Sequence, residues 1–198
     1  MAESVRGPRE RMVFSAAQLI RRDGVTATGM REVAAHAGAP RGSLQHYFPG
    51  GKEQLVGEAV EWAGRYAGKR ATRYLAELAE PSPSLLFAAM VRQWTDEFEA
   101  VGFGGGCPVA AATVDCSDST ESVRAAAAAA FGRWASSVAA ALVALGFPPS
   151  RAAALATLMI SAIEGALVLS RAHHSTAPLV AVDRELGPFL DAEWAALA

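Results

Sequence analysis

The sequence predicts an all-α protein of about nine helices. Proline and glycine divide the chain into segments of helical length, and apolar residues recur in these segments at helical spacing. No window alternates apolar and polar residues in the way a half-buried strand does. Of the 198 residues, 52% are hydrophobic and 19% are charged, which is the balance of a globular protein with a sizeable core.

Each expected helix is bounded by a capping or breaking residue. Asp23-Gly24 ends the first helix, Gly38 ends the second, and Thr28 or Gly29 caps the start of the second. The first four expected helices cover about residues 9–22, 30–37, a short piece within 38–52 with Pro40 in its first turn, and 52–80. The next two run from the 81–84 break to 101 and over 108–115. The last three run from a cap at Asp118 or Ser119 to Gly146, from Pro148-Pro149 through 152–169, and over 178–197.

The charges are distributed unevenly along the chain. Residues 1–52 carry eight Lys or Arg and four acidic residues, so their net charge is +4, whereas the remainder carries −6. A basic front joined to an acidic back is typical of a nucleic-acid-binding end attached to a different kind of domain. The alternative is a solvated face that happens to be basic. A non-specific architectural DNA binder is less favoured, because its basic charge would be spread along the chain.

The third helix is short and rich in hydrogen-bonding side chains. With Leu44 and Phe48 facing the core, its opposite side presents a glycine and short or planar polar residues: Gly42, Ser43, Gln45 and His46. Such side chains read base edges and bind phosphates, and Arg41, Tyr47 and Lys52 flank them. A short helix following a tight turn predicts a DNA-reading helix; the alternative is a solvated turn with accidental polar residues.

The segment ATGMREVAAHAGAPRGSLQHYFPGGKEQL, residues 27–55, resembles the N-terminal helix-turn-helix of TetR-type transcriptional regulators. GAPRGSL, FPGGK and the later GGGCPVAA are similar to the lincomycin-resistance-repressor branch, also called LmrA/YxaF-like. Gln45 departs from the aromatic residue usual after the helix leucine, so no operator sequence is carried over. The residues expected to contact DNA are Thr28, Arg31, Arg41, Gly42, Ser43, Gln45, His46, Tyr47 and Lys52.

This resemblance implies a division into a DNA-binding domain, residues 1–52 with the motif at about 29–48, and an effector-binding and dimerisation domain, residues 53–198. It also implies a homodimer joined through the last two helices, a pseudo-palindromic operator, and repression relieved by a small hydrophobic or aromatic effector.

The apolar stretch 152–169 contains Glu164, which favours a buried helix over a membrane span.

Large apolar side chains gather in the acidic part of the chain. They are either ordinary core or the lining of an effector pocket, and the resemblance favours the pocket. The residues expected there are Trp62, Tyr66, Met90, Trp94, Phe98, Phe103, Cys107, Trp134, Met159, Ile163 and Glu164. Glu164 is either a ligand anchor or a hydrogen-bonding group of the dimer interface.

No catalytic, cofactor or metal site is expected. Cys107 and Cys116 lack metal-ligand spacing and a base partner, although redox sensing remains an alternative for them. The adjacent His173 and His174 point in different directions on a helix and do not form a shared metal site. The remaining alternative functions are a small helical enzyme using Glu164 or Cys107 and a ligand carrier using the apolar C-terminal pocket. The two cysteines and the polar N-terminus favour a cytoplasmic protein.

Overall fold

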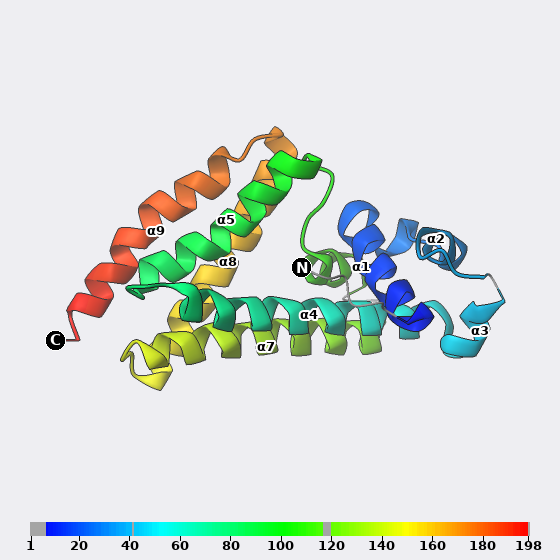
Figure 1. Cartoon of the computed structure of the whole chain (residues 1–198), viewed down its shortest axis with the longest axis horizontal. Helices are drawn as coiled ribbons and strands as arrows, with labels where there is room; N and C mark the ends of the chain where they lie inside the picture. Colours follow the sequence, from blue (N-terminus) through cyan, green and yellow to red (C-terminus); the bar gives the residue numbers. More distant parts are fainter. Residues whose placement is uncertain (1–6, 41, 117–119, 198) are drawn as a thin grey trace. The chain divides into compact units, whose positions relative to one another are not determined.

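The computed structural model describes residues 7–40, 42–116 and 120–197. The described residues form nine helices and no strand, which confirms the all-α fold class. The helices, labelled in Figure 1, are α1 (Pro8–Ala27), α2 (Met30–His36), α3 (Ser43–Tyr47), α4 (Gly51–Glu77), α5 (Pro83–Val101), α6 (Pro108–Cys116), α7 (Glu121–Ala144), α8 (Pro149–His173) and α9 (Ala177–Ala195). The expected caps Asp118 and Ser119 lie outside the described residues.

The chain divides into two compact units. The first contains residues 1–64 and 107–131, and the second contains residues 65–106 and 132–198. The chain passes from one unit to the other three times: inside α4, in the connection between α5 and α6, and inside α7. The first unit is larger than the segment 1–52 assigned to DNA binding, because the first turns of α4, all of α6 and the start of α7 pack with it.

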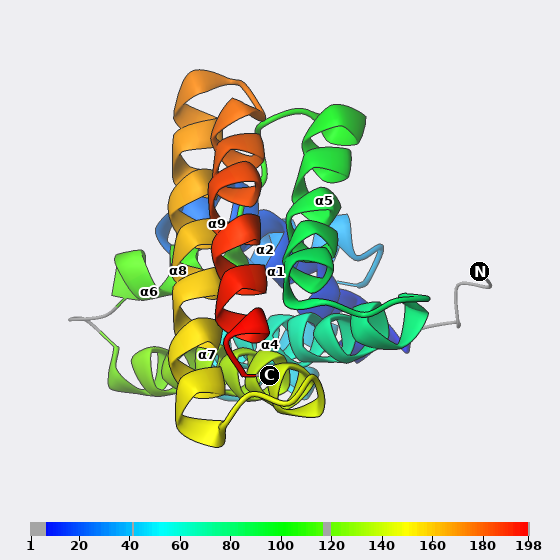
Figure 2. The same ribbon diagram turned by 90° about the vertical axis from the view of Figure 1, so that its left-hand side faces the viewer.

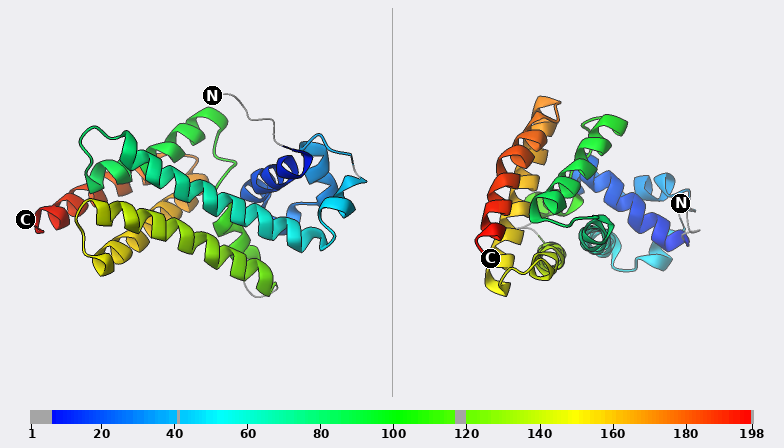
Figure 3. Two further views of the ribbon diagram at one scale, coloured as in Figure 1. Left: turned by 60° about the horizontal axis from the view of Figure 1, so that its bottom comes forward. Right: turned by 60° about the vertical axis from the view of Figure 1, so that its left-hand side comes forward.

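In the first unit, α1 packs against α2 and α6 (Figure 3). Its inward face consists of small and medium apolar residues at helical spacing, and four of them are at most 1% exposed: Met12, Ala16, Ala17 and Ile20. Where α4 meets α7 within this unit, Gly64 permits a close approach. A Cβ atom at Gly64 would lie 2.7 Å from Cα of Ala130, so only glycine fits without displacing α7.

In the second unit, α5, α8 and α9 pack side by side (Figure 2). Phe87, Leu155 and Leu190, one from each helix, are fully or almost fully buried. The ends of α8 and α9 are joined by an ion pair between Arg151 and Glu193, 2.6 Å from Nη2 to Oε2. Burial of apolar surface between three helices is therefore the main stabilising term, and polar contacts fix the helix ends.

Two helices are long and apolar enough to cross a membrane by length and composition alone. The most apolar windows of α7 and α8 have mean hydropathies of 1.3 and 2.0, and 33% and 44% of their residues are buried within the chain. Helices that pack in the core of a soluble protein pass the same test. The expectation that this chain has no membrane partner therefore stays a prediction.

Candidate nucleic-acid interface

The first short helix, α2, is held against α1 by apolar and polar contacts. Val33 and Ala34 are buried, and Arg31 on the other side is exposed. At the end of α2, the Arg11 side chain of α1 donates from Nε to the carbonyl of Ala37 at 3.2 Å. Gly38 follows with φ of 61°, the left-handed conformation that ends many helices. The chain therefore turns sharply between α2 and α3.

The second short helix, α3, begins at Ser43, later than the sequence predicted. Pro40 is outside the helix, where its carbonyl accepts from the Ser43 amide at 3.0 Å and from Oγ of Ser43 at 2.5 Å. The residues around Pro40 are therefore used for a turn, which shortens the helix. At the other end, Phe48 is fully buried, whereas Leu44 is only half-buried.

The outer side of α3 is open. Gly42, Gln45 and His46 are exposed, and no atom would contact a Cβ at Gly42. Tyr47 is half-buried, and its ring lies edge-on to that of His46 with centroids 5.0 Å apart. The α3 face thus combines the amide of Gln45, the imidazole of His46 and the phenol of Tyr47. Beside them, Gly42 leaves room for another molecule to approach the backbone.

Two further residues of the expected DNA-contacting set, Thr28 and Lys52, stand apart from this face. Thr28 is buried, and its hydroxyl donates to the carbonyl of Gly24 at 2.7 Å, so its side chain stabilises the end of α1. Lys52, at the start of α4, donates from Nζ to the carbonyl of Thr26 at 3.2 Å. Arg41 lies outside the described residues.

Sequence reasoning did not single out Arg9 as part of this region. Its guanidinium lies 5.3 Å from the centroid of the Phe48 ring and forms a 2.6 Å ion pair with Glu58 of α4. One arginine of α1 therefore holds the end of α3 and the start of α4 together. Its spacing to Phe48 and Glu58 along the chain carries no local signal, so only the fold reveals this role.

The arginine at the end of α1 is also engaged by acidic neighbours. Arg22 donates to both carboxylate oxygens of Asp23, at 2.8 Å and 3.0 Å from Nε, and lies 3.5 Å from a carboxylate oxygen of Glu32. The hydrogen bond to Asp23 is the main cause that raises the pKa of Arg22 above its ordinary value. The fixed positive charge near α2 is therefore partly neutralised by its own neighbours.

Comparison with protein families decides what kind of helix pair this is. Residues 15–59 match the family model of bacterial regulatory proteins of the tetR family. Residues 83–185 match the C-terminal domain of LmrA/YxaF-like transcriptional regulators, which is half of the chain. The chain belongs to the TetR family. It is an LmrA/YxaF-like transcriptional regulator, which places it among regulators and not among enzymes.

Relatives of this TetR-family chain cover nearly its whole length. It is 42% identical to an uncharacterised helix-turn-helix-type transcriptional regulator of Mycobacterium tuberculosis, over 96% of this chain and 97% of the relative. It is 30% identical to the helix-turn-helix-type transcriptional regulator LmrA of Bacillus subtilis, over 87% and 90%. The crystal structure of a TetR regulator from Legionella pneumophila has the same fold, with a TM-score of 0.80 at 19% identity, covering 94% of this chain and 99% of that one.

The residues expected to line an effector pocket of this TetR-family regulator fall in both units. Trp62 and Cys107 belong to the first unit, where the Trp62 ring packs edge-on against Phe14 with centroids 5.3 Å apart. The others belong to the second unit. There Tyr66 is 46% exposed and accepts from Arg70, and Glu164 is half-buried. Five are buried, Met90, Trp94, Trp134, Met159 and Ile163.

Phe98 and Phe103 form one aromatic contact in the second unit. Phe98 is 2% exposed, and its ring centroid lies 4.9 Å from that of Phe103. Phe103 also contacts the ring of His174, with centroids 5.7 Å apart, and the neighbouring carbonyl of Gly104 accepts from Arg171 at 3.3 Å. The glycine-rich corner after α5 is thus attached to the end of α8.

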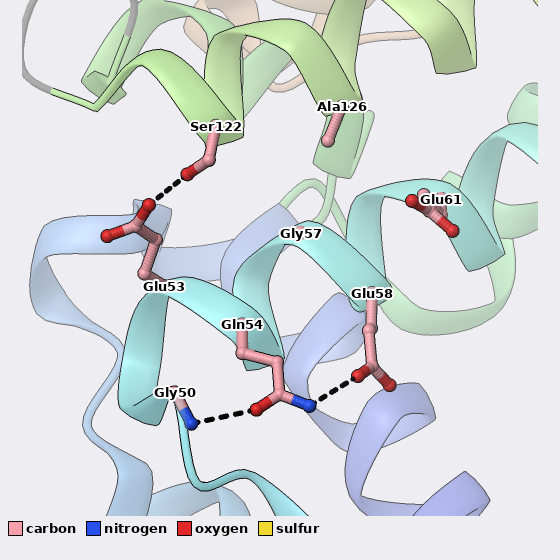
Figure 4. A pocket seen from close by; sticks show the side chains of 8 residues that line it. All are labelled: Gly50, Glu53, Gln54, Gly57, Glu58, Glu61, Ser122 and Ala126. Carbon is pink, nitrogen blue, oxygen red and sulfur yellow. Dashed lines mark hydrogen bonds between the residues drawn. The ribbon is translucent and has the colours of Figure 1, made fainter.

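A pocket of about 490 Å³ lies between the first turns of α4 and α7 in the first unit (Figure 4). Three glutamates, a glutamine and a serine line it together with small residues: Gly50, Glu53, Gln54, Gly57, Glu58, Glu61, Ser122 and Ala126. The Ser122 hydroxyl donates to Glu53, and the Gln54 amide donates to Glu58 at 2.9 Å. None of the residues expected to bind a hydrophobic effector lines this pocket, so it gives that expectation no support.

Proposed function

We propose that this TetR-family regulator is a dimeric, ligand-responsive repressor that binds a pseudo-palindromic DNA operator and is released by a small hydrophobic or aromatic effector. The observation that carries the duplex-binding part is the open face of α3, where Gly42, Gln45 and His46 are exposed over the buried anchor Phe48. A helix anchored on one side and polar on the other fits the major groove of B-form DNA.

The remaining contacts follow from position and chemistry. Arg31 is exposed on α2, and Arg41 precedes α3 in the sequence; both suit phosphate or guanine, and Ser43 and Tyr47 suit phosphate. Lys52 uses one donor of its ammonium group for Thr26, and the group has three, so a phosphate contact remains available to it. In this proposal Thr28 acts from behind the interface, because its side chain is buried. Residues 1–52 carry the contacts, and residues 53–198 carry dimerisation and effector binding.

The proposed dimer interface uses α8 and α9. Both helices expose large apolar side chains although each is packed on its other side, and these residues are Leu158, Val168, Leu169, Val180, Phe189 and Trp194. Apolar surface of this kind on a soluble regulator is typical of an interface. A two-fold dimer buries the same face of each copy, and two α3 helices related by that axis suit an inverted repeat.

The proposed effector site rests on the buried aromatic side chains of the second unit. Trp94, Phe98 and Trp134 supply flat apolar surface, and Glu164 is the polar group that suits an anchor. Effector binding lowers operator affinity if the effector-bound dimer separates the two α3 helices by a distance that no longer matches the half-sites. The protein acts in the cytoplasm, where the DNA is.

A gel-shift experiment with genomic fragments tests the duplex-binding part. We expect a few fragments to form a complex in the presence of excess unrelated DNA, and their affinity to fall steeply between low and moderate salt because phosphate contacts release counterions. Binding to all fragments alike would favour an architectural protein. Absence of any complex, or affinity independent of salt, would contradict the proposal.

A further inference from the structure

Helix α1 is interrupted close to its end. Gly24 has φ of 84° and ψ of 169°, far from helical values, although the residues on both sides are helical. An amide in a regular helix donates to the carbonyl four residues earlier, and a break of this kind removes that partner from the amides that follow it. The turn 24–28 therefore needs hydrogen-bond acceptors from elsewhere in the chain.

Asp115 of α6 provides them. Its Oδ2 accepts from the amide of Val25 at 2.7 Å and from the amide of Thr26 at 3.3 Å, across 90 and 89 residues of sequence. The approach depends on glycine, because a Cβ at Gly24 would lie 2.5 Å from that same oxygen. One side-chain oxygen of Asp115 thus supplies the acceptor that the break at Gly24 takes away from these two amides.

The other side of the same turn is held as well. The Thr28 hydroxyl donates to the Gly24 carbonyl at 2.7 Å, and Lys52 of α4 donates to the Thr26 carbonyl at 3.2 Å. Gly29 and α2 follow immediately. The turn 24–28 is thus the connection between α1 and the short helices, and side chains from α6 and α4 fix it.

We propose that Asp115 is a positioning residue for operator recognition. By capping the turn 24–28 it fixes the direction in which the chain enters α2, and through α2 the orientation of the α3 face. This inference rests on the proposed duplex binding. Recognition of base edges needs an accurately placed α3, whereas general attraction to phosphates does not. Loss of the cap therefore lowers affinity for the preferred sequence and spares non-specific binding.

The test compares D115A with D115N. Both remove the negative charge, but asparagine keeps an oxygen that accepts from the two amides, so the pair separates the hydrogen bond from the charge. D96A, an exposed aspartate of α5, is the matched control. The probes are a duplex enriched by the wild-type protein from a randomised pool and a scrambled duplex of the same composition. Amide hydrogen exchange at Val25 and Thr26, measured without DNA, reports the cap directly.

We expect D115A to exchange both amides at least about tenfold faster and to bind the enriched duplex at least about tenfold more weakly, with scrambled-duplex affinity unchanged. D115N is expected to stay within about threefold of wild type in both measurements, and D96A to match wild type. Should D115A fail to fold by circular dichroism, D115E, which displaces the carboxylate by one methylene, replaces it with the same expected direction.

Unchanged affinity of D115A for the enriched duplex, despite faster amide exchange, would overturn the inference. So would equal weakening by D115N and D115A, because charge and not the cap would then be responsible. If the wild-type protein itself enriches no duplex, the proposed function fails. In that event hydrogen exchange without DNA still tests the cap separately, and slow exchange at Val25 and Thr26 in D115A would refute it.

Discussion

The short helices α2 and α3 of the first unit and the long helices α8 and α9 of the second unit expose different kinds of side chain. In the first unit, the short helices α2 and α3 expose polar side chains such as Arg31, Gln45 and His46. In the second, the long helices α8 and α9 expose apolar side chains, with Val168 at 65% and Val180 at 54% exposure. Both units are helical, so secondary structure does not distinguish them. The binding partner that suits each unit depends on the side chains that its helices expose on the side away from the core.

The largest expected effect comes from placing a charge on the apolar face of the second unit. Val168→Glu leaves the fold intact because the side chain is exposed, but a proposed dimer would bury the carboxylate. We expect a monomer by analytical ultracentrifugation. We also expect operator affinity to fall by up to about 100-fold, because a monomer loses the gain from binding two linked half-sites at once. The base preference of each half-site stays the same.

Val101→Glu is the matched control, since Val101 of α5 is 73% exposed. This variant should keep the wild-type mass and affinity. If Val168→Glu also sediments as the wild type does, the proposed interface on α8 is wrong and the comparison between the units loses its second half.

Packing inside the first unit gives the next effect. Gly64→Ala inserts a methyl group 2.7 Å from Cα of Ala130 and should lower the free energy of unfolding by about 1–3 kcal/mol. Gly132→Ala, on α7 with nothing within 4 Å, should instead raise it by up to about 1 kcal/mol. Chemical denaturation measures both. Equal effects of the two substitutions would show that close helix approach at Gly64 does not matter.

His46→Ala affects recognition without affecting assembly. His46 is exposed on α3, and its loss should weaken operator binding about 5- to 30-fold while the sedimentation behaviour and melting temperature stay unchanged. His173→Ala, which removes an exposed histidine of α8, is the control and should bind as the wild type does. A loss of affinity shared by both variants would count against a special role for the α3 face.

The smallest effect concerns the partly buried carboxylate Asp183 of α9. Burial is the main cause that raises the pKa of Asp183, and Arg92 partly opposes it. The folded state therefore holds this proton more tightly than the unfolded state, and the ionised group lowers stability above its pKa. Asp183→Asn should raise the melting temperature by about 1–3 °C at neutral pH. The difference should shrink as the pH falls through the raised pKa of the folded state and should be lost below the ordinary value of about 4, and a constant difference would contradict this cause.

The sequence was sufficient for the fold class because its signals are local. Asp23-Gly24 and Gly38 interrupt the helical pattern, and the backbone leaves helical geometry at Gly24 and Gly38. Phe48 was predicted to be buried and is, although it lies just past the end of α3 and Leu44, which was predicted to face the core with it, is only half-buried. The start of α3 was placed too early, since Pro40 suits a turn as well as a first helical turn.

The contacts that hold the short helices were beyond the sequence. Asp115 caps a turn 90 residues away, and Arg9 joins Phe48 to Glu58 across the unit. Long-range pairs of this kind depend on how α1, α4 and α6 pack together, and no local pattern encodes that packing. For the same reason the pocket in Figure 4, formed by α4 and α7, was not foreseen.

Sequencing the duplexes selected from a randomised pool by wild-type protein and by Gln45→Ala tests the reading of bases by α3 most directly. We predict that the wild type enriches an inverted repeat and that the variant loses base preference at one symmetric pair of positions, one in each half. An identical motif with identical affinity for the variant, or no inverted repeat for the wild type, would contradict base reading by the exposed face of α3.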